Sequence, residues 1–145
     1  MEINNIENFK MLLGDTIMLY QVVENDIRVI RAHMRSGDPT QNLEEDKEKL
    51  KGLGQLIYAL EDLDKGSDPR FFADDFYRNL KRIAHFRNYY CHECAISFAY
   101  EKEFPNPKFN DAFYRLKRDH DELYGLFNGL EVVKQKVLNM YRREN

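Results

Sequence analysis

Five polar side chains are spaced so that together they could bind a phosphodiester. They follow one another at intervals of three, four, three and four residues and are Arg78, Lys81, His85, Asn88 and His92. This spacing aligns them along one face of an α-helix. Lysine and arginine neutralise phosphate, asparagine can fix an oxygen, and histidine can exchange a proton near neutral pH. The alternative is a solvated helix face on which like charges happen to align.

Arg87 is unusual for a different reason, because it occupies a position in the apolar stripe of the same predicted helix. That stripe otherwise consists of Phe76, Leu80, Ile83, Tyr90, Cys94 and Phe98. A guanidinium in such a seam must find partners within the chain or face another chain, since an unpaired buried charge is very costly. The surrounding segment is basic: residues 69–92 carry five Lys or Arg against two Asp, whereas the whole chain has a net charge of −3.

The segment 87–92 reads Arg-Asn-Tyr-Tyr-Cys-His, with an Arg and a His separated by four residues and an Asn directly after the Arg. This string resembles the signature of the HEPN superfamily (higher eukaryotes and prokaryotes nucleotide-binding domain). HEPN domains are small helical bundles that carry the motif on a late helix. Many of them are metal-independent ribonucleases of the toxin or phage-defence type, so the resemblance implies RNA as the substrate and no cofactor.

The resemblance also implies roles for individual residues. Arg87 would hold the scissile phosphate, His92 would act on the 2′-hydroxyl or the leaving group, and Asn88 would orient it, while Arg78, Lys81 and His85 would bind RNA nearby. Arg87 and His92 are five residues apart, which places them about 140° apart around a helix. HEPN proteins resolve this by dimerising so that two motifs line one cleft, and we therefore expect a homodimer through the third helix.

One departure from the family pattern concerns a protein partner. In HEPN toxins that pair with a nucleotidyltransferase antitoxin, the residue two positions after the His is often a Tyr that the antitoxin modifies, and here it is Cys94. That form of control is in doubt, although an antitoxin or another partner protein is possible. Some HEPN domains have lost catalysis. The alternative function is therefore a non-catalytic interaction module, either a degenerate HEPN domain or an unrelated helical bundle, that dimerises or binds a protein partner.

A metal site is a competing hypothesis. The possible ligands are His85, Cys91, His92, Cys94 and His120. Carboxylate-bridged sites in bundles use Glu-x-x-His pairs, and paired Cys-x-x-Cys sites need a second pair; the sequence has neither. We therefore expect no bound metal and interpret the two cysteines as small core residues. His120 falls in a predicted seam, either as a hydrogen-bonded core residue or facing Arg87 across the bundle.

The elements that would position these residues are four long helices. Apolar residues recur at intervals of seven, and Gly or Pro separates the segments, which predicts helices at about 4–35, 39–64, 69–103 and 109–142. Asp38-Pro39 and Asp68-Pro69 are predicted to cap the second and third helices. Gly52 and Gly54 weaken the second one and indicate a kink or a close contact. We predict an all-α, up-and-down bundle forming a single domain, 1–145.

The remaining features bear on location. The apolar runs are far shorter than a membrane span, and the N-terminus has no signal-peptide pattern. We therefore expect a cytoplasmic protein with no membrane contact, in which Cys91 and Cys94 stay reduced.

Overall fold

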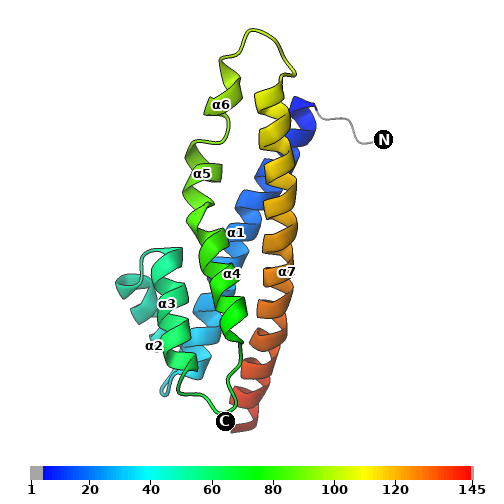
Figure 1. Ribbon diagram of the computed structural model, residues 1–145. Helices are drawn as coiled ribbons and strands as arrows, with labels where there is room; N and C mark the ends of the chain where they lie inside the picture. Colours follow the sequence, from blue (N-terminus) through cyan, green and yellow to red (C-terminus); the bar gives the residue numbers. More distant parts are fainter. Residues whose placement is uncertain (1–4, 145) are drawn as a thin grey trace.

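The computed structural model describes residues 5–144, and all regular secondary structure in that range is helical (Figure 1). The helices are α1 (Ile6–Met34), α2 (Pro39–Lys49), α3 (Leu53–Asp64), α4 (Asp74–His85), α5 (Arg87–His92), α6 (Ile96–Ala99) and α7 (Pro107–Glu144). The all-α prediction is confirmed.

The two long helices, α1 and α7, agree closely with the first and fourth predicted helices. The Asn5 side chain caps α1 by accepting the backbone N–H of Asn8, and Gly37, with φ of 100°, turns the chain just after the helix. At the start of α7 the Asn106 side chain accepts the N–H of Phe109 at 2.9 Å. Local capping signals therefore set these boundaries.

The second predicted helix is divided into α2 and α3, which corrects the range 39–64. Leu50 and Gly52 both have extended backbone conformations, so the helix ends between them. The glycine disfavours helix, and Arg28 of α1 donates to the carbonyl oxygens of Asp46 (3.4 Å) and Leu50 (3.1 Å), which satisfies the end of α2. The expected kink is thus a complete break.

The third predicted helix is also divided, into α4, α5 and α6. Helix begins at Asp74 rather than at Pro69, because the buried Asp64 carboxylate accepts the backbone N–H groups of Phe71 (2.8 Å) and Phe72 (3.0 Å). Those bonds hold residues 65–73 as a loop. The predicted cap at Asp68-Pro69 is therefore wrong, whereas Asp38 accepts the N–H of Gln41 at 3.4 Å and caps α2 as predicted.

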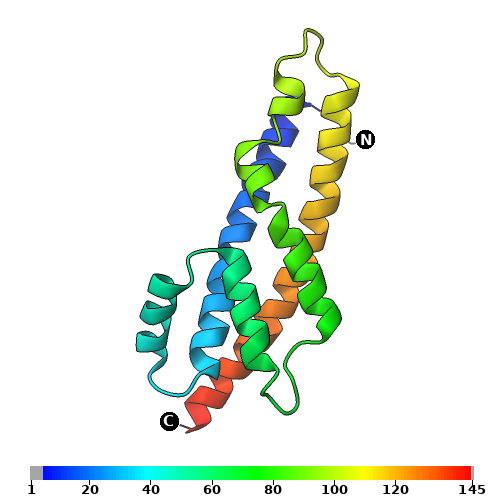
Figure 2. The same cartoon turned by 60° about the vertical axis from the view of Figure 1, so that its left-hand side comes forward.

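The break between α2 and α3 adds a reversal of chain direction, so α1 and α7 run parallel (Figures 1 and 2). Contacts between the two helices follow the same order along both: Phe9 with Phe109, Asp26 with Lys134, and His33 with Tyr141. A simple up-and-down bundle of four long helices would make its first and last helices antiparallel. That part of the prediction is wrong for this chain.

The core runs the length of α1 and α7 and includes one side of α3, α4 and α5. Its largest buried side chains are Phe9, Tyr20, Tyr77, Tyr90, Phe109 and Phe113. The heptad positions predicted for α1 point inward, since Tyr20 and Ile27 are buried and Leu13 packs against the core. Burial of these apolar surfaces is the main favourable term in folding.

Helix α2 attaches to α1 mostly through polar contacts. Its buried residues are Pro39, Asn42 and Asp46. The Asp46 carboxylate forms ion pairs with Arg31 and Arg35 of α1, and the Asn42 amide donates to the Ala32 carbonyl at 3.0 Å. Buried charges need such partners, so the docking of α2 depends on them.

Asp64 provides a test of the loop that precedes α4. Besides the two N–H groups, it accepts the Tyr77 hydroxyl at 2.7 Å. We expect Asp64→Ala to lower the free energy of unfolding by about 3 kcal/mol, because two buried donors and one partly buried donor lose their acceptor. Urea unfolding followed by circular dichroism measures this. The control Asp62→Ala, on the exposed side of the same helix, should change stability by less than about 0.5 kcal/mol; equal losses in both variants would contradict the assignment.

Asp26 gives stability a predicted pH dependence. Burial, aided by the nearby Glu131 carboxylate and opposed by Lys134, raises the pKa of Asp26 from its ordinary value of 3.8 to about 6. The folded state therefore holds this proton more tightly than the unfolded state. The stabilisation of the folded state by this proton is complete below pH 3.8 and is lost as the pH rises through 6.

We compare the unfolding free energy of the wild-type protein with that of Asp26→Asn. The wild-type value minus the variant value should fall by about 1–3 kcal/mol between pH 4 and pH 7. Denaturant titrations at several pH values provide the measurement. Asp15→Asn, on the exposed side of α1, is the control and should track the wild-type protein. A constant wild-type-minus-variant difference for Asp26→Asn would show that the residue does not titrate in this range.

Candidate functional site on helix α5

Helix α5 carries the segment 87–92 and is separated from α4 by a break at Phe86. The Phe86 N–H donates to the Ile83 carbonyl at 3.2 Å, a tighter turn than an α-helix makes, and the backbone then restarts at Arg87. The Phe86 ring lies under the guanidinium of Arg115 at 4.6 Å. The predicted polar stripe is therefore divided: Arg78, Lys81 and His85 lie on α4, and Asn88 and His92 on α5.

Arg87 is half-buried and finds its partner inside the chain. Its side chain is 36% exposed, and Nη2 lies 3.8 Å from Oε2 of Glu24 on α1. The Glu24 carboxylate also forms an ion pair with Arg28, at 3.4 Å. Arg87 therefore lies at the edge of the predicted apolar seam rather than inside it, whereas Tyr90, which belongs to the same predicted stripe, is buried. A partner chain is therefore not required to neutralise Arg87.

The other two predicted catalytic residues, Asn88 and His92, are exposed at the surface of α5. No hydrogen bond or ion pair within residues 5–144 joins either of them to Arg87. Their helix positions put His92 about 140° from Arg87, so one chain presents the pair on different sides of α5. A phosphate in solution can reach Arg87 or His92, but the two side chains of one α5 do not point toward a common phosphate.

The predicted RNA-binding side chains have mixed surroundings. Arg78 pairs with Asp75 at 2.5 Å, and Lys81 pairs with Glu61 of α3 at 2.6 Å while lying 4.3 Å from the Tyr58 ring centre. His85 is exposed and lies beside Phe86. The basic segment seen in the sequence is thus largely neutralised by carboxylates.

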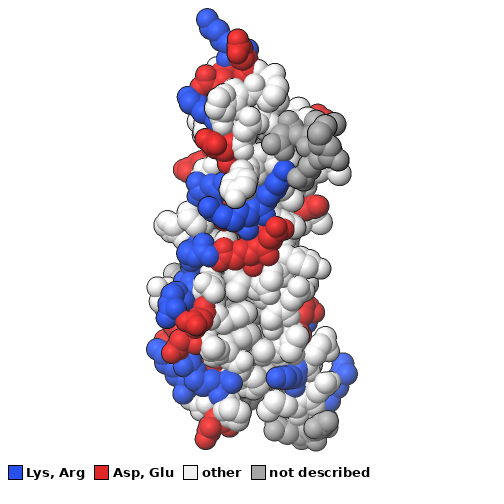
Figure 3. All heavy atoms as spheres, turned by 45° about the vertical axis from the view of Figure 1, so that its right-hand side comes forward, with Lys and Arg blue, Asp and Glu red and all other residues white. Residues whose placement is uncertain are grey.

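The same mixing of charge is visible elsewhere on the surface. Figure 3 shows blue and red side chains close together on the α7 side of the bundle, with a broad uncharged area in the lower half. Within the described chain no helix is both long enough and apolar enough to span a membrane.

Helix α5 is anchored to α7 by a group of interacting residues that was not predicted from the sequence. The Tyr90 hydroxyl donates to the buried Asp119 carboxylate, and Arg115 lies 3.7 Å from the same carboxylate and 4.1 Å from the centre of the Tyr89 ring. Burial, followed by the hydrogen bond to Asp119, raises the pKa of the Tyr90 phenol above its ordinary value, so it remains a donor. The available signal was Asp119 itself, a charge among the apolar seam positions of α7.

The residues considered for a metal do not form a cluster. Cys94 is buried in the core as predicted, and burial raises the pKa of its thiol; Cys91 is half-buried. His120 is also half-buried, with Nδ1 3.6 Å from Asp121, and it stacks on Tyr124. Among the residues that the structure describes, no three His, Cys, Asp or Glu side chains are placed to hold one ion.

Comparison of the chain with protein-family models, with curated proteins and with solved structures found no match. The resemblance to HEPN domains therefore depends on the residues of α5 and on the helical fold.

The Tyr90–Asp119 pair is the testable anchor of α5. We expect Tyr90→Phe to lower the free energy of unfolding by about 1–2 kcal/mol, because the buried Asp119 carboxylate loses a hydrogen-bond donor while the ring is retained. Tyr100→Phe, at a residue that is 87% exposed, is the control. Chemical denaturation measures both variants, and a Tyr90→Phe protein as stable as the control would contradict the anchoring role.

Proposed function

We propose that the chain is a HEPN-like, metal-independent endoribonuclease of the toxin or phage-defence type, acting through α5. The observation that supports this most directly is the arrangement of the Arg and the His at the two ends of one short helix. Arg87 is partly exposed and steadied by Glu24, and His92 is open to solvent. Both side chains can therefore meet an RNA strand without unfolding any part of the bundle.

The proposed chemistry divides between these residues. Arg87 binds the scissile phosphate and stabilises the charge that develops on its oxygens. His92 takes the proton from the 2′-hydroxyl or gives one to the departing 5′-oxygen, and Asn88 orients the group that His92 serves. Attack of the 2′-oxygen on phosphorus then breaks the bond to the 5′-oxygen and leaves a 2′,3′-cyclic phosphate end.

The divergence of Arg87 and His92 on one helix suggests how the site is completed. In a two-fold dimer through the α4–α5 segment, each copy's α5 faces the other, so Arg87 of one chain and His92 of its partner can act on the same phosphate. The loose ion pair of 3.8 Å to Glu24 leaves the guanidinium able to accept a phosphate as a second partner. Arg78, Lys81 and His85 would then contact flanking RNA on α4.

A second function, a non-catalytic interaction module, is favoured by two other observations. Arg78, Lys81 and Arg87 each have a carboxylate partner within the chain, which weakens a surface for RNA. In addition, large apolar side chains are exposed on both long helices: Met11, Met18 and Val22 share one face of α1, and Tyr114, Tyr124 and Val132 lie along α7. An exposed apolar stripe such as that of α1 is typical of surfaces that contact another protein.

The test separates these functions by activity. Incubation of the purified protein with transfer RNA and total RNA should give cleavage that survives EDTA and leaves 2′,3′-cyclic phosphate ends. We expect Arg87→Ala and His92→Ala each to lower the rate by about 10²-fold or more, because each removes a group that acts on the reacting atoms. Helical circular dichroism and thermal melting should stay close to those of the wild-type protein, since both side chains are partly or fully exposed.

Arg142→Ala, which removes the same charge at the far end of α7, is the matched control and should cleave like the wild-type protein. Cleavage that needs a divalent metal, or that persists in both α5 variants, would refute the proposed roles. Absence of any cleavage, together with dimerisation or capture of a protein partner, would favour the interaction module.

A further inference from the structure

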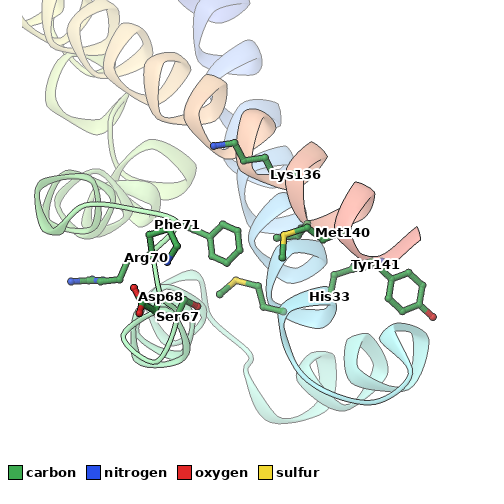
Figure 4. A pocket seen from close by; sticks show the side chains of 11 residues that line it. His33, Ser67, Asp68, Arg70, Phe71, Lys136, Met140 and Tyr141 are labelled. Atoms are coloured by element: carbon green, nitrogen blue, oxygen red, sulfur yellow. The ribbon is translucent and has the colours of Figure 1, made fainter. Parts of the chain in front are cut away.

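A pocket of about 550 Å³ lies at the end of the bundle where α1 and α7 finish, well separated from α5. Its walls come from the end of α1, the loop 65–73 and the last turns of α7 (Figure 4). This volume is in the range of pockets that hold small molecules in proteins. Asp119, which anchors α5, precedes the pocket residues of α7 by about five helical turns, so the two sites are independent.

The floor of the pocket is apolar and contains two methionines. Met34, Phe71, Val137 and Met140 line it, and Phe71 and Met140 reach into the hollow from the loop and from α7 (Figure 4). Thioethers make favourable contacts with aromatic rings, and methionine side chains adapt to the shape of a ligand. The lining therefore suits a flat aromatic group better than a branched aliphatic one.

The charges around the opening favour one negative charge on the ligand. Lys136 lies on the α7 side and forms no ion pair with any residue that the structure describes. Arg70 also borders the pocket, but it pairs with Asp74 at 2.8 Å and extends away from the hollow (Figure 4). Asp68 lies on the loop side and disfavours negative charge there, so a single anionic group is favoured only on the α7 side, at Lys136.

From the apolar floor and the unpaired Lys136 we infer that this pocket is a binding site for a small aromatic monoanion, such as an aromatic carboxylate. The ring lies between Phe71 and the two methionines, and the carboxylate lies at Lys136. The loop that forms one wall is held by Asp64 through the N–H groups of Phe71 and Phe72, so the site is already shaped without its ligand.

The methionines make this testable by NMR. The full chain carrying ¹³C-methyl methionine is titrated with 2-naphthoate and, separately, with the uncharged 2-naphthamide. Ring currents should shift the methyl signals of Met34 and Met140 in a saturable way, while those of Met11 and Met18, exposed on α1, stay in place. Those two residues serve as internal controls against binding to exposed apolar surface.

Two pairs of variants test the parts of the site. Lys136→Gln should weaken the binding of 2-naphthoate by about two- to fivefold, as expected for one exposed charge pair, and leave the affinity for 2-naphthamide unchanged. Lys10→Gln, on the exposed face of α1, should change the affinity for neither compound. Met140→Trp should fill the hollow and abolish the shift at Met34 for both compounds, whereas Met18→Trp should have no effect on it.

Saturable shifts confined to Met34 and Met140, with these variant effects, support the site. Shifts at Met11 or Met18, or no saturation at any methyl, overturn it. Equal affinity for the acid and the amide, unaffected by Lys136→Gln, overturns the assignment of an anionic ligand.

Discussion

The fold depends on the requirement that a buried carboxylate be paired. All buried charged side chains among the described residues are aspartates, and each one joins two parts of the chain. Asp26 links α1 to Lys134 of α7, Asp46 holds α2 against the arginines of α1, Asp64 holds the loop before α4, and Asp119 receives Tyr90 of α5. Leaving any of these carboxylates unpaired in the interior would cost several kcal/mol. The apolar core supplies most of the favourable free energy, and the aspartates determine which segments meet.

Tertiary hydrogen bonds explain two helix boundaries in the middle of the chain. The Asp64 carboxylate accepts the backbone N–H groups of Phe71 and Phe72 and holds that segment outside the helix, and Arg28 donates to the carbonyl oxygens at the end of α2. These bonds satisfy backbone groups of Leu50, Phe71 and Phe72, which lie outside the helices, so the chain can leave the helical conformation there. The result is an additional hairpin, α2–α3, and a parallel arrangement of α1 and α7.

Pairing with carboxylates also determines how much positive charge remains on the surface of α4 and α5. Helix α4 is basic in sequence, but the acidic side chains of α3 and of its own first turn lie beside it, so Arg78 and Lys81 are paired. On α5 the pairing is looser, and Arg87 keeps a partly exposed guanidinium on the same short helix as the exposed Asn88 and His92. Helix α5 and the pocket near Lys136 share this feature: each has a cation whose charge the fold leaves incompletely neutralised, at a place that solvent can reach.

The sequence by itself determined the helical class, the extents of α1 and α7, and the inward-facing positions of both, because heptad spacing and capping residues act locally. It also identified the α5 residues as chemically unusual. Only the tertiary structure decided where α2 ends and where α4 begins, since these boundaries depend on contacts of Arg28 and of the buried Asp64 carboxylate with backbone groups that helical periodicity does not identify. It also decided that Glu24 faces Arg87 and that Asp119 receives Tyr90. Periodicity gives the face on which a residue lies, but it does not say which side chain lies opposite across an interhelical contact, and that partner sets the residue's charge and exposure.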